Sequence, residues 1–295
     1  MKILVTGATG FIGSELIPML NGHDIYQLSR KEKLSPNCIQ SSLENFISNQ
    51  VIEEKFEVVI HLAALAHDNS KTLADFRRIN RDSTIALAKQ AASNGLRRFV
   101  YVSTIGVNGN TTKDAPFTEL CDVTPHSDYA VSKYETELAL RKMSAELNFE
   151  LVLIRPPLVY GINAPGNFSK LVKLALTKCP LPFGAINNSR SYISVKNLCE
   201  FIVVCSEHPS AANELFLVSD DETYSLNELI RNIWVARNIK SFMVPVPVLV
   251  FRKMFTLLGK TSLATQLLDN LEIDSSKAKR ILGWTPRFNL LNTLK

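Results

Sequence analysis

The sequence lacks an apolar run long enough to cross a membrane, and it shows no secretory leader. A spanning helix needs roughly 18 to 20 consecutive apolar residues, whereas the nearest stretch, 242–251, is short and contains Pro245 and Pro247. Residues 2–6 already have the pattern of a buried strand, with no charged segment, long apolar segment and cleavage site before them. We therefore expect a cytoplasmic chain without a membrane span.

Cysteine and histidine are scarce, and neither forms a pattern typical of a metal site. The five cysteines are odd in number and include no C-x-x-C pair, which favours reduced thiols in the cytoplasm. His61 and His67 lie near an apolar strand without a cluster of carboxylates. A histidine in that setting is most often a hydrogen-bonded structural residue, so we expect no metal.

A strong charge of either sign is also absent. The net charge of +5 arises from 33 basic and 28 acidic residues spread along the chain without a basic run. This excess fits an anionic small molecule better than nucleic acid, and a solvated surface accounts for it equally well. The 295 residues, 46% of them hydrophobic, suffice for a large α/β domain or for a core domain with a smaller appendage.

Two tyrosines precede a lysine by four positions, namely Tyr129 before Lys133 and Tyr192 before a second lysine. On a helix this spacing places both side chains on one face, where the ammonium favours the phenolate and lowers the phenol pKa from about 10. Only Tyr129 has hydroxyl residues at a preceding strand end, Ser103 and Thr104. The sequence therefore predicts Tyr129 and Lys133 as a proton-transfer pair.

A glycine-rich turn joins the predicted strand 2–6 to a predicted helix over 11–20. Glycines at this point let the backbone turn sharply and let a pyrophosphate approach main-chain amides at a helix N-terminus. Because the turn lies between a strand and a helix, it predicts a dinucleotide site, with a purely structural turn as the alternative. The residues expected to contact the cofactor are Gly7, Gly10, Phe11, Ile12, Gly13, Arg30, Leu62, Ala63, Ala64, Tyr129, Lys133 and Pro156.

The residue after the second predicted strand, 25–28, bears on the choice of cofactor. A site that prefers NAD usually offers an acidic residue there to the ribose hydroxyls, whereas an arginine suits a 2′-phosphate. Arg30 occupies this region, so NADP(H) is favoured and NAD(H) stays open. The alternative is that Arg30 is a solvated loop residue.

Strand and helix patterns alternate six times in the first half of the chain. The strands are expected at 2–6, 25–28, up to 39, 57–62, 98–104 and 150–155. This order predicts an α/β fold with a doubly wound parallel sheet of the Rossmann type and a smaller C-terminal substrate lobe. We assign 1–160 to the dinucleotide-binding core and 161–295 mainly to the lobe, with segments near 190–220 returning to the core. In the helix predicted over 73–94, the amide of Asn80 either bridges to active-site backbone or is solvated.

With these motifs placed, the chain resembles the extended short-chain dehydrogenase/reductase family, and in particular nucleotide-sugar 4-epimerases and 4-ketoreductases. The resemblance covers nearly the whole chain. Besides the glycine turn and the Tyr129 to Lys133 motif, it rests on NRDST at 80–84, VNG at 107–109, RPPLVYG at 155–161, RSYISV at 190–195 and DSSKAKRILGWTP at 274–286. One departure is Asn197, where the family often has an aspartate; we expect a structural role for it.

The resemblance implies a catalytic triad of Thr104, Tyr129 and Lys133, in which Lys133 also holds the nicotinamide ribose. It implies a UDP-sugar substrate, held by Ser103, Thr104, Asn167 and Arg190. Arginine suits a diphosphate because its guanidinium offers a planar pair of donors. A surface ion pair is the alternative for Arg190.

The reaction expected from this resemblance is hydride exchange at C4 of a UDP-hexose. Arg30 favours a 4-ketoreductase, because an epimerase regenerates its cofactor and commonly retains NAD. A C4 epimerase is the alternative, and a non-catalytic NAD(P)-binding sensor is a further one. Ile105 follows Thr104 where dehydratases of the family usually have an acid pair, which disfavours dehydration.

One apolar segment, 244–258, has no place in this scheme. It contains Arg252 and Lys253, and it could touch a membrane or a polyprenyl-linked substrate. The alternatives are that it caps the substrate lobe or pairs subunits in a homodimer.

Overall fold

The computed structural model describes residues 1–30, 37–48, 54–66, 70–177 and 179–294. Its main sheet has seven strands in the order β3-β2-β1-β4-β5-β6-β9, and all neighbouring strands are parallel. The strands are β1 (Lys2–Thr6), β2 (Asp24–Ser29), β3 (Cys38–Gln40), β4 (Val58–His61), β5 (Arg98–Val102), β6 (Glu150–Arg155) and β9 (Leu215–Leu217). The strand order reverses direction between β1 and β4, where ligands bind in doubly wound sheets. The predicted fold class is confirmed.

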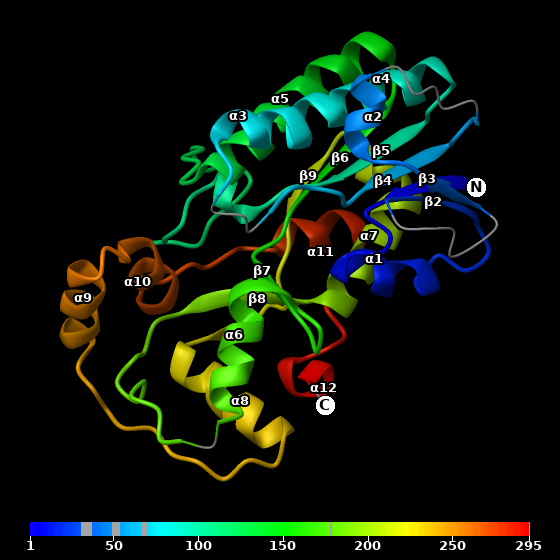
Figure 1. The fold of residues 1–295 in the computed structure, drawn as a ribbon. Helices are drawn as coiled ribbons and strands as arrows, with labels where there is room; N and C mark the ends of the chain where they lie inside the picture. The colour runs from blue at the N-terminus through cyan, green and yellow to red at the C-terminus, as the bar shows by residue number, and fades with distance from the viewer. Residues whose placement is uncertain (31–36, 49–53, 67–69, 178, 295) are drawn as a thin grey trace.

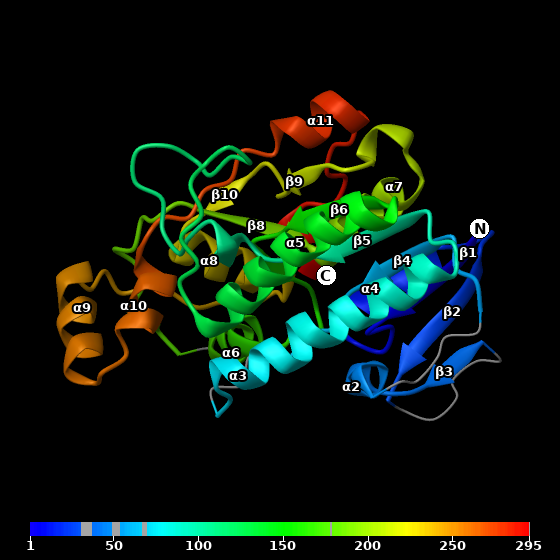
Figure 2. The same ribbon diagram turned by 90° about the horizontal axis from the view of Figure 1, so that it is seen from above.

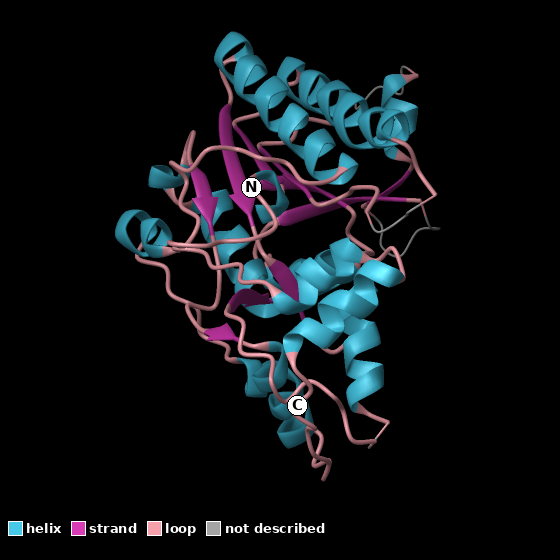
Figure 3. Cartoon of the chain, turned by 90° about the vertical axis from the view of Figure 1, so that its left-hand side faces the viewer, coloured by secondary structure: helices cyan, strands magenta, loops and turns pink. Residues whose placement is uncertain are grey.

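Helices cover both faces of this sheet because its strands are apolar on both sides. One face packs on α1 (Phe11–Leu16), α7 (Val195–Glu207) and α11 (Ser276–Leu282). The other packs on α2 (Leu43–Ile47), α4 (Ser83–Ser93) and α5 (Asp128–Leu147). Figures 1 and 3 show the strands enclosed between these two helical layers.

The helix predicted over 73–94 is interrupted by a π-helical turn. It consists of α3 (Leu73–Phe76), the π-helical turn η2 (Arg77–Asp82) and α4. Thr72 and Asp75 form a capping box at its start. Gly95 follows its end with a φ of +86°, a value that favours glycine. Single π turns inside helices are frequent at functional sites.

The second half of the chain builds a lobe beside the carboxyl ends of the strands (Figures 1 and 2). A small sheet, β10-β8-β7, contains β7 (Leu158–Tyr160), β8 (Arg190–Ser194) and β10 (Thr223–Tyr224). The lobe has its own core with α6 (Gly166–Ala175), α8 (Leu226–Ala236), α9 (Val248–Leu257), α10 (Thr261–Leu268) and α12 (Leu290–Leu294). Meanwhile α7, β9 and α11 pack with the main sheet. The division near residue 160 stays a proposal.

Two further observations concern compartment and membrane. All five cysteines are free thiols. Within the described ranges, no helix combines the length and apolar character that crossing a bilayer requires.

Candidate active site

The glycine-rich turn lies against the chain that leaves β4. Gly7 has a φ of +70°, and a Cβ on it would lie 2.9 Å from the backbone nitrogen of Ala63. A Cβ on Gly13 would lie 2.3 Å from the carbonyl oxygen of Gly7. The hydroxyl of Thr6 accepts from the Ala63 amide at 3.3 Å. Only glycine permits these approaches, and the resulting bare backbone at the end of β1 fits a dinucleotide pyrophosphate.

His61 at the end of β4 is a buried, hydrogen-bonded residue, as the sequence predicted. Its ring nitrogens lie 2.9 Å from the hydroxyls of Thr6 and Thr84. Burial, and then the nearby charge of Lys133, lowers the pKa of His61 to about 3, so the ring is neutral. Among the described residues, no group of three or more potential metal ligands exists. The other histidine considered, His67, lies outside the described residues.

Arg30 is exposed directly after β2. The register pairs Leu28 of β2 with Thr6 of β1. Arg30 therefore emerges at the sheet edge from which the glycine turn also leaves. This position fits its predicted contact with the adenosine half of a dinucleotide, and that role stays a proposal.

The hydroxyls predicted at the end of β5 have different environments. Ser103 is 4% exposed, and its hydroxyl has no hydrogen-bond partner within the described part of the chain. Thr104 is half-buried and its hydroxyl accepts from the Gly106 amide at 3.1 Å. The next amide, of Ile105, donates to the carbonyl of Pro156 at 2.9 Å. Thr104 and Pro156 therefore lie at the same edge of the sheet.

Tyr129 and Lys133 lie in the first two turns of α5, which is capped by Ser127. Lys133 is 2% exposed, donates to the carbonyl of Val102 at 2.6 Å and lies 4.1 Å from the centre of the Tyr101 ring. The lysine thus holds α5 against the end of β5, where Thr104 follows.

The predicted acidic phenol is not found. Burial raises the pKa of Tyr129 to about 12 and lowers that of Lys133 to about 7. The physical reason is that desolvation penalises both charged forms, while the ammonium is directed at the Val102 carbonyl. The second motif fails as a helical pair, because Tyr192 lies on β8 and Lys196 on α7.

Asn80 bridges to the backbone of Leu65, so the alternative that it is solvated is wrong. That this backbone belongs to the active site stays a prediction. Asn80 is 1% exposed and lies in the π-helical turn. Its amide accepts from the Leu65 amide at 2.7 Å and donates to the Leu65 carbonyl and the Ser132 hydroxyl, both at 3.1 Å. Asn80 therefore ties the chain after β4 to the helix that carries Lys133.

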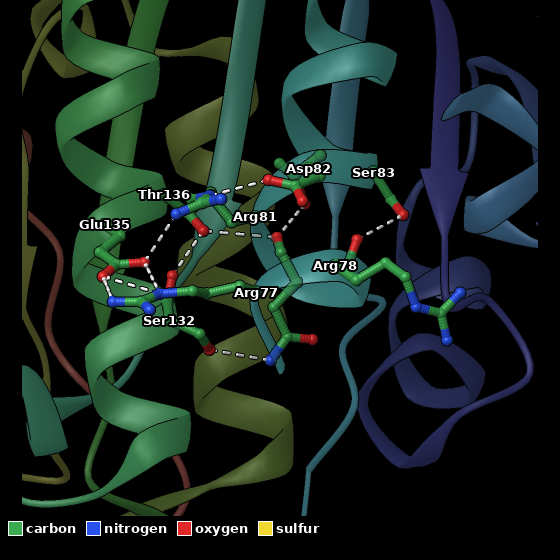
Figure 4. Close-up of polar contacts among 10 residues, drawn as sticks. Arg77, Arg78, Arg81, Asp82, Ser83, Ser132, Glu135 and Thr136 are labelled. Atoms are coloured by element: carbon green, nitrogen blue, oxygen red, sulfur yellow. Dashed lines mark hydrogen bonds and ion pairs between the residues drawn. The ribbon is translucent and has the colours of Figure 1, made fainter. Parts of the chain in front are cut away.

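The same interface holds a charged cluster, shown in Figure 4. Arg77 donates to Glu135 of α5 at 2.8 Å and 2.5 Å, and Arg81 reaches the same carboxylate at 3.1 Å. Hydrogen bonds from Arg77 lower the pKa of Glu135, so the carboxylate is charged. The cluster fixes the π-helical turn against α5.

Asn167 and Arg190 both contact the chain around the end of α10. Asn167, in the first turn of α6, donates to the side chain of Gln266 at 2.9 Å. Arg190 starts β8 and donates to the carbonyl of Asp269 at 2.8 Å, and burial lowers its pKa. Among the described residues, Arg190 therefore bonds to a backbone carbonyl and forms no surface ion pair. Its predicted role in binding a diphosphate stays a proposal.

Sequence reasoning missed His126. Its Nδ1 donates to the Gly106 carbonyl at 3.1 Å, next to the Thr104 turn. Burial and then the charge of Arg190 lower its pKa, which places Arg190 near the start of α5. A lone loop histidine carries no signal in a sequence. His126 becomes a candidate site residue only because the fold brings Arg190 of β8 close enough for its charge to act on the ring.

Comparison with known proteins agrees with this geometry. The profile of the NAD dependent epimerase/dehydratase family matches residues 3–219. UDP-glucose 4-epimerase of Vibrio cholerae is 36% identical over 97% of this chain and 90% of its own length. dTDP-4-dehydro-6-deoxyglucose reductase of Escherichia coli is 25% identical over 96% and 92%. The structure of Thermotoga maritima UDP-glucose 4-epimerase with UDP-glucose superposes with a TM-score of 0.80 at 23% identity, covering 100% and 96% of the two chains.

Proposed function

Because this chain belongs to the NAD dependent epimerase/dehydratase family, we propose that it exchanges hydride at C4 of a UDP-hexose and acts as a C4 epimerase. Support comes from the meeting of three elements at one edge of the sheet. Lys133 bonds to Val102 just before Thr104, and Tyr129 lies one turn earlier on the same helix. These contacts support a phenol, a hydroxyl and an ammonium close to the carboxyl end of β5, two strands from β1, which the glycine turn follows.

Each group has a role that its environment supports. Tyr129 exchanges a proton with the C4 oxygen, and Thr104 donates a hydrogen bond to that oxygen. Lys133 binds the nicotinamide ribose. The nicotinamide, when bound, supplies the hydride transfer that no side chain provides.

The pKa values indicate whether Tyr129 first donates or first accepts a proton. With a pKa of about 12, Tyr129 is protonated at neutral pH and prepared to donate. To accept a proton it needs added positive charge nearby, because such charge favours the phenolate. Lys133, with a pKa of about 7, is partly charged near neutrality and can supply part of it.

We assign the substrate diphosphate to Arg190 and Asn167, which both contact the chain around the end of α10 in the lobe. Arg190 offers planar donors to phosphate oxygens, and its charge reaches His126 beside Thr104. The buried Ser103 hydroxyl, unpartnered within the described residues, is a further candidate for a sugar hydroxyl.

A 4-ketoreductase is the second candidate, and Arg30 is the observation that favours it. An arginine suits the 2′-phosphate of NADPH, which a reductase consumes. The 36% identity to the Vibrio enzyme favours epimerisation instead. A third alternative, a sensor that binds the cofactor without turnover, has no need of a tyrosine one helical turn from a buried lysine, as Tyr129 and Lys133 are.

One experiment separates these proposals. The purified protein is denatured, released nucleotide is identified by absorbance and mass, and native protein is incubated with UDP-hexoses and UDP-4-keto sugars under NMR. Retained NAD with interconversion of C4 epimers supports the epimerase. Exchangeable NADPH with reduction of a 4-keto sugar supports the reductase, and bound nucleotide without any turnover supports the sensor.

A further inference from the structure

The outward face of α9 is apolar, although it lies at the surface. Phe251 and Phe255 are 6% and 9% exposed and face the core of the lobe. The rest of the helix surface and the helix end carry five exposed apolar residues. They are Leu249 (63%), Val250 (52%), Met254 (42%), Leu257 (88%) and, at the end of the helix, Leu258 (59%).

These residues form one face because they recur at helical spacing. Leu249 and Leu257 are two turns apart, and Val250 and Met254 are one turn apart. Lys253 lies in the middle of the same face, one turn from both leucines. A solvated helix normally turns polar residues outward. The outer face of α9, defined as these five apolar residues and Lys253, is therefore suited to a non-aqueous contact.

The chain segment that contains α9 is basic. Between Glu228 and Asp269 the sequence has no acidic residue and six basic ones. They are Arg231, Arg237, Lys240, Arg252, Lys253 and Lys260. Phe242, 61% exposed, and Val244, 40% exposed, precede α9 in the same segment. Of the six, Arg252 pairs with Asp269. Exposed apolar side chains in a segment with a net positive charge are typical of helices that lie on anionic membranes.

The position of α9 leaves its outer face accessible. In Figures 1 and 2, α9 and α10 form the outermost edge of the lobe, away from the main sheet. The pair of helices α9 and α10 still contacts the residues proposed to bind substrate. Arg252 of α9 pairs with Asp269 at 2.5 Å, and the Asp269 carbonyl accepts from Arg190 at 2.8 Å.

We propose that the outer face of α9 docks on the surface of an anionic lipid bilayer. The helix lies in the interface with its apolar residues among the acyl chains and its basic neighbours at the headgroups. A symmetric pairing of two copies through this face would bring Lys253 and its basic neighbours against their own copies, which disfavours that occupant. The inference is independent of the reaction proposed above.

The test is flotation of the full chain with phosphatidylglycerol-rich vesicles and with pure phosphatidylcholine vesicles. We expect binding to the first that is at least tenfold stronger and falls with added salt. The double variant Leu249→Ser/Leu257→Ser loses this binding, and Lys253→Glu weakens it severalfold. Leu120→Ser, at a residue 96% exposed in another loop, and Lys142→Glu, on α5 and 79% exposed, bind as the parent does.

Three results overturn the proposal. The first is absence of flotation with anionic vesicles, and the second is equal flotation of the α9 variants and the control variants. The third is a dimer in sedimentation that the double variant converts to monomers without lipid, which would show that this face joins two copies. Thermal melting establishes that the variants are folded, which is expected because the replaced side chains are exposed.

Discussion

Glu137, which lies one helical turn after Lys133 on α5, forms a buried ion pair with Arg155 of β6. Arg155 donates to the two carboxylate oxygens at 3.0 Å and 2.5 Å, and the side chains are 1% and 4% exposed. The same guanidinium donates to Asn108 at 2.9 Å, in the turn that follows Thr104. The pair therefore connects the helix that carries Lys133 to the turn that carries Thr104.

Glu137→Gln should destabilise the protein and shift the titration of Lys133. Removing one partner leaves Arg155 buried and uncompensated, which costs about 3–5 kcal/mol. Because Glu137 raises the pKa of Lys133, the variant should protonate Lys133 only at lower pH. Urea denaturation measures the first effect. The pH profile of kcat/KM measures the second, as a shift of the Lys133 limb to lower pH.

The matched control is Glu146→Gln at the exposed end of the same helix. Glu146 pairs with Lys142 at 3.8 Å, and both side chains are more than half exposed. Surface pairs of this kind contribute about 0–1 kcal/mol. Equal losses in the two variants would contradict the structural role given to the buried pair.

Tyr129→Phe should abolish most turnover without loosening the cofactor. Without the phenol hydroxyl the C4 oxygen has no proton partner, and general acid–base groups contribute typically 10²–10⁴-fold, so we expect kcat to fall by about that factor. Cofactor affinity, measured by fluorescence titration, should stay close to the parent value. Tyr134→Phe on the same helix is the control. Full activity in Tyr129→Phe would disprove the mechanism.

Asn80→Ala should weaken cofactor binding through the chain after β4. The substitution leaves both backbone groups of Leu65 without their side-chain partner, at a cost of about 1–3 kcal/mol. Ala63, beside the glycine turn, then loses its support, so Kd for the cofactor should rise in calorimetric titration. Asn232→Ala, which removes a hydrogen bond to the Glu228 carbonyl on α8, should leave Kd unchanged.

Much of the main sheet could be predicted because its strands are compact apolar runs separated by helical periodicity. The bridge that Asn80 makes can be predicted for a related reason. The sequence pattern predicts the helix over 73–94, and a parallel sheet places that helix beside the end of β4. Local structure that depends on neighbouring residues, such as the glycine turn and the start of α5, can therefore be predicted from the sequence.

The electrostatics of the site could not be predicted in the same way. The spacing of Tyr129 and Lys133 suggests an ammonium beside a phenol, but the Val102 carbonyl takes the ammonium and burial acts on both groups. Glu137 meets Arg155 only once α5 is packed beside β6. Such pairings depend on tertiary placement, and no local pattern encodes them.

Arg30→Asp should change the preference between the two nicotinamide dinucleotides. An arginine after β2 suits a 2′-phosphate, whereas a carboxylate repels it and can accept from the ribose hydroxyls. We expect the ratio of Kd for NADPH to Kd for NADH to rise at least tenfold. Arg141→Asp on α5, away from this edge, should leave the ratio unchanged. An unchanged ratio in Arg30→Asp would assign Arg30 to the solvent.

His61 should make the protein sensitive to acid. Its pKa is about 3 in the folded chain, against about 6.5 for an ordinary histidine, because burial and then Lys133 penalise the charged ring. Between these values the unfolded chain binds a proton that the folded chain does not, so stability falls as the pH falls, by up to about 1.4 kcal/mol per pH unit.

His61→Gln should be less stable near neutrality, because it loses the ring packed on Tyr101, yet its stability should decline less between about pH 6 and about pH 4. Urea denaturation across this range gives both slopes. His23→Gln, at a partly buried pair with Glu207, should retain the His61 contribution. Parallel profiles for the parent and His61→Gln would show that the buried ring is not the acid-sensitive group.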